Sequence, residues 1–83
     1  MESTNDQLRE LSLLEQIEGD PNVNQSALAV QLGVAVGTVN WHLKRLIAKG
    51  AVKVSRAERK KLRYIITPEG LALRARLAVD YVE

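Results

Sequence analysis

The sequence contains no cysteine and no phenylalanine, and only 4% of its 83 residues are aromatic. The absence of cysteine excludes disulfides, thiolate metal sites and thiol catalysis. No apolar run approaches the roughly 18 residues that a membrane span needs, and the acidic start Met1–Thr4 does not resemble a secretory signal. We therefore expect a soluble, cytoplasmic protein that does not contact a membrane.

A chain of 83 residues has room for one small domain, which we assign to residues 1–83. A domain near this size buries only about 60 to 65% of its unfolded surface, which leaves little spare stability. We therefore expect a homodimer.

Charge is distributed unevenly along the chain. Residues 1–40 contain one basic and six acidic residues, whereas residues 41–83 contain eleven basic and four acidic residues. Within residues 41–63, nine basic residues face one acid, Glu58, for a net charge of +8. Such a segment is expected where a protein surface meets phosphates, and the alternative is a solvated charged face.

Apolar residues recur at helical spacing in the first half of the chain. This spacing predicts helices over 6–19, 25–32 and 36–49, with residues 1–5 flexible. Gly33 allows the left-handed backbone that ends one helix and turns the chain sharply into the next. A short helix, a glycine-containing turn and a longer helix together predict a helix-turn-helix.

After Gly50 the apolar period changes from helical spacing to alternation. Val52 and Val54, and then Leu62, Tyr64 and Ile66, predict a hairpin over 52–67 whose charged loop forms a wing. Thr67-Pro68-Glu69 is a typical start for a last helix over 68–82. The fold class is thus mainly α with a small β-hairpin, a winged helix-turn-helix, with a possible extra strand near Val23.

The segments Gln25–Val34 and Gly37–Gly50, together with Ile66–Gly70, resemble the winged-helix core of MarR-type bacterial regulators. The likeness is closest to the small members associated with exopolysaccharide loci. This resemblance implies sequence-specific binding of double-stranded DNA by a dimer, with the third helix in the major groove.

The residues themselves are compatible with such binding. If the apolar positions of the third helix face inward, its polar residues lie on or beside an outward arc that can enter the major groove. Asn40 can address adenine through two hydrogen bonds, and the basic wing can reach the phosphate backbone or the minor groove. The predicted DNA-binding residues are Gly37, Thr38, Asn40, Trp41, Lys44, Arg45, Arg56, Arg59, Lys60 and Lys61.

Two positions depart from the family pattern. Ala35 stands where the relatives commonly have a serine that caps the recognition helix, so about 1 kcal/mol of capping is expected to be missing. Trp41 stands where a polar residue is common. It can either contact thymine methyl groups or pack against the wing or a partner.

The last helix carries two apolar stripes, and a small core can cover only one of them. We therefore predict a dimer formed by the first and last helices. Its expected interface residues are Leu13, Leu73, Leu77 and Tyr81. Larger relatives bind small effectors between their lobes, but this chain has little room for such a pocket, so an effector is not expected.

No constellation for catalysis, cofactors or metals is evident. His42 is the single histidine and has no clustered ligand beside it in the sequence, so a packed imidazole is expected and no metal. We predict that the protein is not an enzyme and needs no cofactor. Alternatives to DNA binding are a winged-helix module for protein partners, which Trp41 favours, and recognition of structured RNA.

Overall fold

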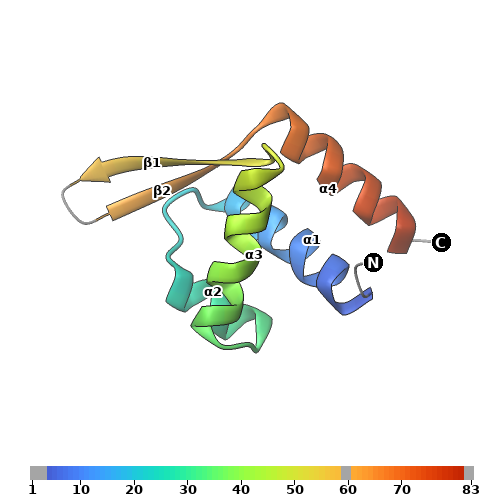
Figure 1. The fold of residues 1–83 in the computed structure, drawn as a ribbon, viewed down its shortest axis with the longest axis horizontal. Helices are drawn as coiled ribbons and strands as arrows, with labels where there is room; N and C mark the ends of the chain where they lie inside the picture. Colours follow the sequence, from blue (N-terminus) through green and yellow to red (C-terminus); the bar gives the residue numbers. More distant parts are fainter. Residues whose placement is uncertain (1–3, 59–60, 82–83) are drawn as a thin grey trace.

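The computed structural model describes residues 4–58 and 61–81, which form four helices and one hairpin (Figure 1). The elements are α1 (Thr4–Gly19), α2 (Gln25–Leu32), α3 (Val36–Ala48), β1 (Val52–Glu58), β2 (Lys61–Ile66) and α4 (Pro68–Tyr81). This is the predicted winged helix-turn-helix order. The hairpin extends from one end of the helical body, and α4 lies toward the other end.

The core lies where α1 meets the other elements. Helix α1 packs against α2, α3, α4 and β2, and three of its side chains, Leu13, Leu14 and Ile17, are almost completely buried. Removing such side chains from water is the main stabilising term for a domain of this size. The other buried apolar side chains are Val23, Leu28, Ala29, Val39, Leu43, Leu46, Ala51, Val52, Tyr64 and Leu77.

The turn between α2 and α3 forms as predicted. Asn24 caps α2, because its side chain accepts a hydrogen bond of 2.7 Å from the backbone N–H of Ala27. Gly33 ends α2 with a φ of 68°, a left-handed conformation that glycine adopts without strain. The backbone N–H of Val34 then bonds to the carbonyl of Ala29 at 3.0 Å, which fixes the angle at which α3 begins.

The hairpin is anchored at its base and exposed beyond it. Val52 pairs with Ile66 and Val54 with Tyr64 in an antiparallel register, with an irregularity between Arg56 and Glu58. Val52 and Tyr64 are buried, whereas Val54 is exposed. The outer part of the hairpin therefore projects from the body, as expected of a wing.

Thr67 joins the hairpin to α4. Its hydroxyl donates to the carbonyl of Gly50 at 2.6 Å and accepts from the backbone N–H of Gly70 at 3.0 Å. Its backbone N–H donates to the carbonyl of Ala51 at 3.0 Å. The end of α3 and the start of α4 are thus held together across the base of the hairpin.

Two details of the predicted fold need correction. Helix α1 begins at Thr4, so Thr4 and Asn5 belong to a helix rather than to a flexible segment. No strand forms near Val23, where the described chain makes a turn. The outer edge of β2 makes a backbone hydrogen bond there, from Tyr64 N–H to the Pro21 carbonyl at 3.2 Å, and this bond does not extend into a ladder.

The lengths and apolar character of the helices can be compared with those of a membrane span. Among the described residues, no helix has both the length and the apolar character needed to cross a bilayer.

Candidate nucleic-acid interface

Helix α3 presents an outward arc along its length. Gly37, Trp41 and Lys44 are exposed, and they share one face because they are spaced four and three residues apart. The opposite face, with Val39, Leu43 and Leu46, is buried. Ile47 follows these residues at helical spacing, but it is 38% exposed because it lies at the edge of the buried face.

Thr38 and Asn40 flank the outward arc on opposite sides, and both are half-buried. The side-chain amide of Asn40 donates from Nδ2 to Oε1 of Gln25 in α2 at 3.4 Å. Asn40 therefore lies at the α2 side of the arc with one of its two N–H groups engaged.

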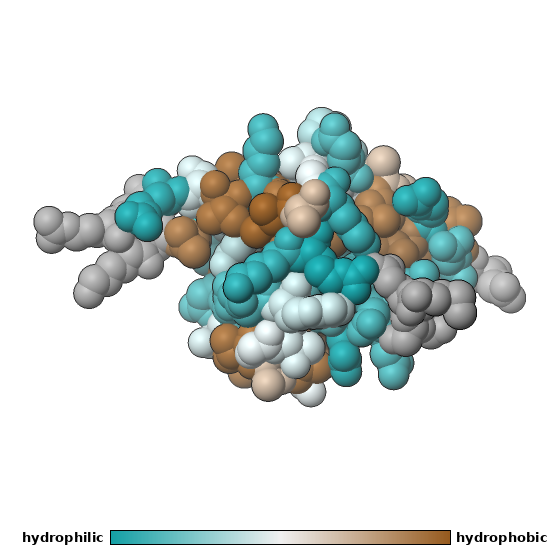
Figure 2. All heavy atoms as spheres, viewed as in Figure 1, coloured by the Kyte–Doolittle hydropathy of each residue, from teal (hydrophilic) through white to brown (hydrophobic). Residues whose placement is uncertain are grey.

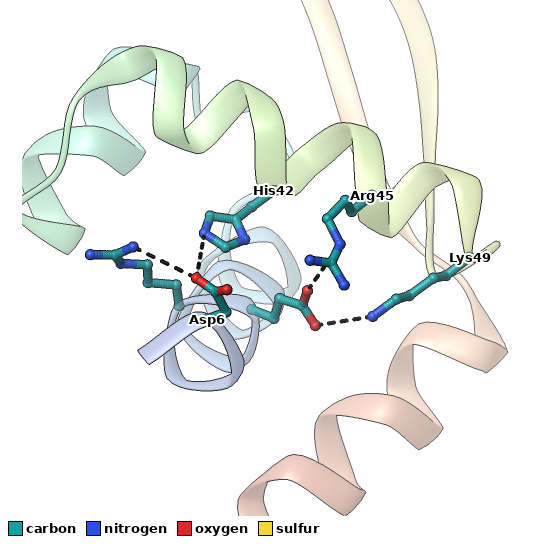
Figure 3. A network of polar contacts seen from close by, with 6 residues as sticks. Asp6, His42, Arg45 and Lys49 are labelled. Carbon is teal, nitrogen blue, oxygen red and sulfur yellow. Dashed lines mark hydrogen bonds and ion pairs between the residues drawn. The ribbon is translucent and has the colours of Figure 1, made fainter. Parts of the chain in front are cut away.

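Arg45 is directed toward α1 (Figure 3). Its Nε lies 4.0 Å from Oε2 of Glu10, and its Cζ lies 4.8 Å from the centre of the Trp41 ring. A guanidinium over an indole face is attracted to the negative face of the ring. Arg45 thus supports the side chain of Trp41 from the α1 side instead of occupying the outward arc.

A seam of charged side chains joins α1 and α3 next to Arg45. Glu10 is only 1% exposed, and its Oε1 accepts from Nζ of Lys49 at 3.4 Å. Because a buried carboxylate is costly without partners, Arg45 of α3 and Lys49 at its C-terminal cap compensate the charge of Glu10. Two of the basic residues counted in the +8 segment are therefore turned toward α1.

His42 lies in the same seam and is 1% exposed. Its Nε2 is 3.8 Å from Oδ1 of Asp6, and neither ring nitrogen has a hydrogen-bond partner among the described residues. Burial lowers the pKa of His42 below 6.5, while Asp6 opposes the shift and the positive charges of Arg9 and Lys49 add to it. The imidazole is thus a packed, uncharged side chain at neutral pH.

The wing carries further basic side chains. Lys53 and Arg56 are exposed on β1. Arg63, on β2, is exposed and donates from Nε to Oδ1 of Asn22 at 3.2 Å, which connects the wing to the turn before α2. The side chains of three predicted contacts lie outside the described part of the chain: Arg59, Lys60 and Lys61.

The predicted dimer residues are placed differently from expectation. Leu13 is 0% exposed and Leu77 is buried, so both side chains lie in the core of the single chain and not on its surface. Leu73 packs partly against the same core, and the side chain of Tyr81 lies outside the described part. In this orientation of α4, Arg74 Nε also pairs with Glu18 Oε1 of α1 at 2.8 Å.

The other apolar stripe of α4 faces outward. Leu71 and Val79 are exposed, as is Ala75 between them, and Leu8 is exposed on α1. Figure 2 shows hydrophobic surface along the α4 side of the molecule. This stripe, defined as Leu71, Ala75 and Val79, is the outer face of α4.

Three functional candidates were missed by the sequence reasoning: Glu10, Gln25 and Tyr64. Each contacts a partner that lies far away in the sequence. Glu10 pairs with Arg45, 35 residues later, and with Lys49, 39 residues later. Gln25 bonds to Tyr64, 39 residues later. No local pattern marks such pairs. Within the described residues there is also no cluster of three or more metal-ligating side chains.

The fold and the open face of α3 define a winged helix-turn-helix, and comparison with known families agrees. Residues 7–53, more than half of the chain, match the winged helix-turn-helix DNA-binding family. The chain belongs to this family. The family is defined by DNA binding, and two of the three solved relatives described next are named as transcription regulators.

Solved structures of bacterial regulators, several of them named as MarR family proteins, resemble the chain. A MarR family protein of Mycobacterium tuberculosis in complex with salicylic acid is 26% identical over 87% of this chain and 55% of its own, with a TM-score of 0.75. MepR, a transcription regulator of the Staphylococcus aureus multidrug efflux pump MepA, is 21% identical over 92% and 56%, with a TM-score of 0.74. A MarR family regulator from Silicibacter pomeroyi is 26% identical over 93% and 50%, with a TM-score of 0.71.

These comparisons confirm the resemblance to MarR-type regulators at the level of the fold. The chain spans about half the length of each of these solved proteins. A search of curated proteins finds no match.

Proposed function

We propose that the protein is a cytoplasmic transcriptional regulator that binds double-stranded DNA as a dimer, with α3 in the major groove and the wing on the backbone or in the minor groove. The observation that carries this proposal is the open outward arc of α3. Gly37, Trp41 and Lys44 are exposed along one face of a helix whose other face is buried. An α-helix presented in this way fits the width of the major groove.

The side chains beside the arc suit distinct parts of DNA. Asn40 has the donor and acceptor that the major-groove edge of adenine requires, and Thr38 can bond a base or a phosphate. Gly37 has open space where a side chain would be, so the backbone can approach a base edge closely. Lys44 from α3, and Lys53 and Arg56 from the wing, supply positive charge for phosphates.

For the dimer we propose the outer face of α4, together with Leu8 of α1, in place of the buried leucines. An apolar stripe on a small domain is costly to leave in water, and a second copy of the same face can cover it. Two recognition helices in such a dimer would be expected about one DNA turn, or 34 Å, apart.

A mobility-shift assay on a DNA site selected from a random pool tests the assignment. Asn40→Ala should relax base preference at one position of each half-site, because a base contact is lost. Arg56→Ala should weaken binding to all sequences alike and lower the slope of log K against log salt concentration by about one, because a phosphate contact is lost. Equal losses on every sequence for both variants would contradict the proposal.

A second candidate is a module for a protein partner, favoured by the 49% exposure of Trp41 on the outward arc. Because Trp41 is the single tryptophan, its fluorescence reports directly on this face. No change in its emission with DNA fragments at low salt, and no retention on DNA, would support the protein partner. Preference for an A-form duplex over B-form DNA would indicate RNA binding instead.

A further inference from the structure

Two side-chain hydrogen bonds connect β2, α2 and α3 behind the outward arc. Nε2 of Gln25 donates to the hydroxyl oxygen of Tyr64 at 2.9 Å, and Oε1 of Gln25 accepts from Nδ2 of Asn40 at 3.4 Å. All three groups are partly buried. One glutamine thus links the strand of the wing to the residue of α3 that is best suited to read a base.

The fold holds both the backbone of Gln25 and its hydrogen-bond partner Tyr64 in place. Gln25 is the first residue of α2, and the cap by Asn24 fixes the backbone of that turn. Tyr64 is 4% exposed, so its ring is held in the core, and its backbone N–H bonds to the carbonyl of Pro21. The hydroxyl of Tyr64 is therefore a fixed point from which Gln25 is oriented.

The hydrogen bond that Asn40 donates to Gln25 orients the side-chain amide of Asn40. A free asparagine has a broad terminal torsion, so its amide plane is poorly defined. Asn40 has two N–H groups and one oxygen, and the bond to Gln25 uses one N–H. The second N–H and Oδ1 remain, which are the donor and acceptor required for N7 and N6 of adenine.

We propose that Gln25 and Tyr64 are positioning residues that set base specificity through Asn40, without themselves contacting a base. This proposal rests on the proposed DNA binding. Ordering one mobile side chain on binding costs about as much as a three- to tenfold change in affinity. If Asn40 is already oriented, this ordering cost is not incurred when it bonds to its matching base. At other bases Asn40 makes no such bond, so the affinity gained is confined to the matching site and appears as specificity.

Two variants remove the bonds while keeping the shape of the side chains. Tyr64→Phe retains the buried ring and deletes the hydroxyl, and Gln25→Met retains the length of the side chain without its polar atoms. Gln31→Met is the matched control, because Gln31 is an exposed glutamine of the same helix. Thermal unfolding of each variant verifies that it folds. If Tyr64→Phe does not fold, Gln25→Met still tests the proposal, because Gln25 is only half-buried.

The main measurement is competition binding between the selected site and sites that differ from it at one base pair. We expect both variants to lose three- to tenfold in preference at the position that Asn40→Ala affects, and at no other position. The salt slope should stay unchanged, since no phosphate contact is lost. In an Asn40→Ala background, neither variant should have a further effect on preference, and Gln31→Met should have none in either background.

An equal loss of affinity for all sequences, at an unchanged salt slope, would overturn the proposal, because it would mean that Gln25 contacts the DNA backbone through an uncharged hydrogen bond. Full retention of preference would overturn it as well. The NMR signals of the Asn40 side-chain amide in the DNA-free protein provide a separate readout, and they should shift in Tyr64→Phe and not in Gln31→Met. Unchanged signals would overturn the positioning role alone, whereas wild-type protein that does not bind DNA would overturn the proposed function.

Discussion

At Gly70 the backbone of α4 passes directly over the end of the turn that follows α3. A Cβ atom added there would overlap the carbonyl oxygen of Ala51 and lie 2.7 Å from Cγ1 of Ile66. Backbone cannot yield as a flexible side chain can, so any substitution must displace the start of α4.

We expect Gly70→Ala to lower the free energy of unfolding by about 3 kcal/mol, the upper end of the usual cost of overpacking. Urea denaturation measures this change. Gly19→Ala is the control, because a Cβ at Gly19 meets no atom within 4 Å, and it should be neutral or slightly stabilising. Similar losses for both variants would show that the contact with Ala51 is unimportant.

His42 predicts a pH dependence of stability with a defined sign. Because burial lowers its pKa in the folded state below 6.5, the unfolded chain binds a proton at higher pH than the folded protein does. The free energy of unfolding should therefore fall as the pH is lowered through 6.5, and level off below the pKa of the folded state. Asp6 opposes this effect, while Arg9 and Lys49 strengthen it.

Replacement His42→Leu should remove this component, since leucine fills a similar volume and does not titrate. Urea unfolding of both proteins between pH 7.5 and about 5 gives the comparison. The sequence has a single histidine, so the difference between the two curves belongs to this residue. Parallel curves over the whole range would contradict the prediction.

At the scale of the elements, α3 begins without the side-chain cap that α2 has. Ala35 occupies the N-cap position with φ and ψ of −72° and 154°, and no side chain bonds to the first turn. This confirms the missing cap that the sequence predicted. The backbone is already in the extended conformation that a capping serine adopts.

We therefore expect Ala35→Ser to raise the free energy of unfolding by about 1 kcal/mol, because a backbone N–H of the first turn can donate a new hydrogen bond to the serine hydroxyl oxygen. Chemical denaturation measures the gain. Ala48→Ser, at the exposed far end of the same helix, should change stability by less than about 0.5 kcal/mol. An equal gain at both positions would argue against capping.

The types of the elements and most of their bounds could be predicted from the sequence because local signals determine them. Gly33 and Asn24 mark the turn and the cap of α2, and the alternation from Val52 marks the hairpin. The rotation of α4 could not be predicted in this way. Its two apolar stripes are equivalent in the sequence, and the buried one is selected by packing against a core whose residues lie far away along the chain.

The candidate site shows the same division. Helical periodicity correctly predicts that Gly37, Trp41 and Lys44 face outward. Helical periodicity does not reveal that Arg45 points toward α1. Its partner Glu10 lies 35 residues earlier, and a buried carboxylate such as Glu10 attracts a basic side chain more strongly than an exposed one. Charge counted along the chain therefore overstates the positive charge available on α3.

At the scale of the whole molecule, the main exposed apolar feature of the last helix is the outer face of α4. Val79 is 72% exposed and lies on α4, at the opposite end of the molecule from the hairpin (Figure 1). A partner bound there would leave both the outward arc of α3 and the wing accessible.

Light scattering should give a mass of twice the 9.2 kDa of one chain at micromolar concentration. Val79→Glu should shift this mass toward the monomer, because two copies of a carboxylate would be buried in a symmetric contact. Val30→Glu is the matched control, as Val30 is an 81% exposed valine on α2 and its replacement should leave the mass unchanged. A monomeric wild-type protein would refute the proposed dimer.

The clasp that Thr67 makes with Gly50, Ala51 and Gly70 has a mechanical consequence. These hydrogen bonds oppose a change in the angle between the end of α3 and the start of α4. In the dimer that we propose, the angle at which two α4 helices cross would then dictate how far apart the two α3 helices stand. The crossing angle of the two α4 helices would therefore set the spacing of DNA half-sites that the protein tolerates, although this surface does not contact DNA.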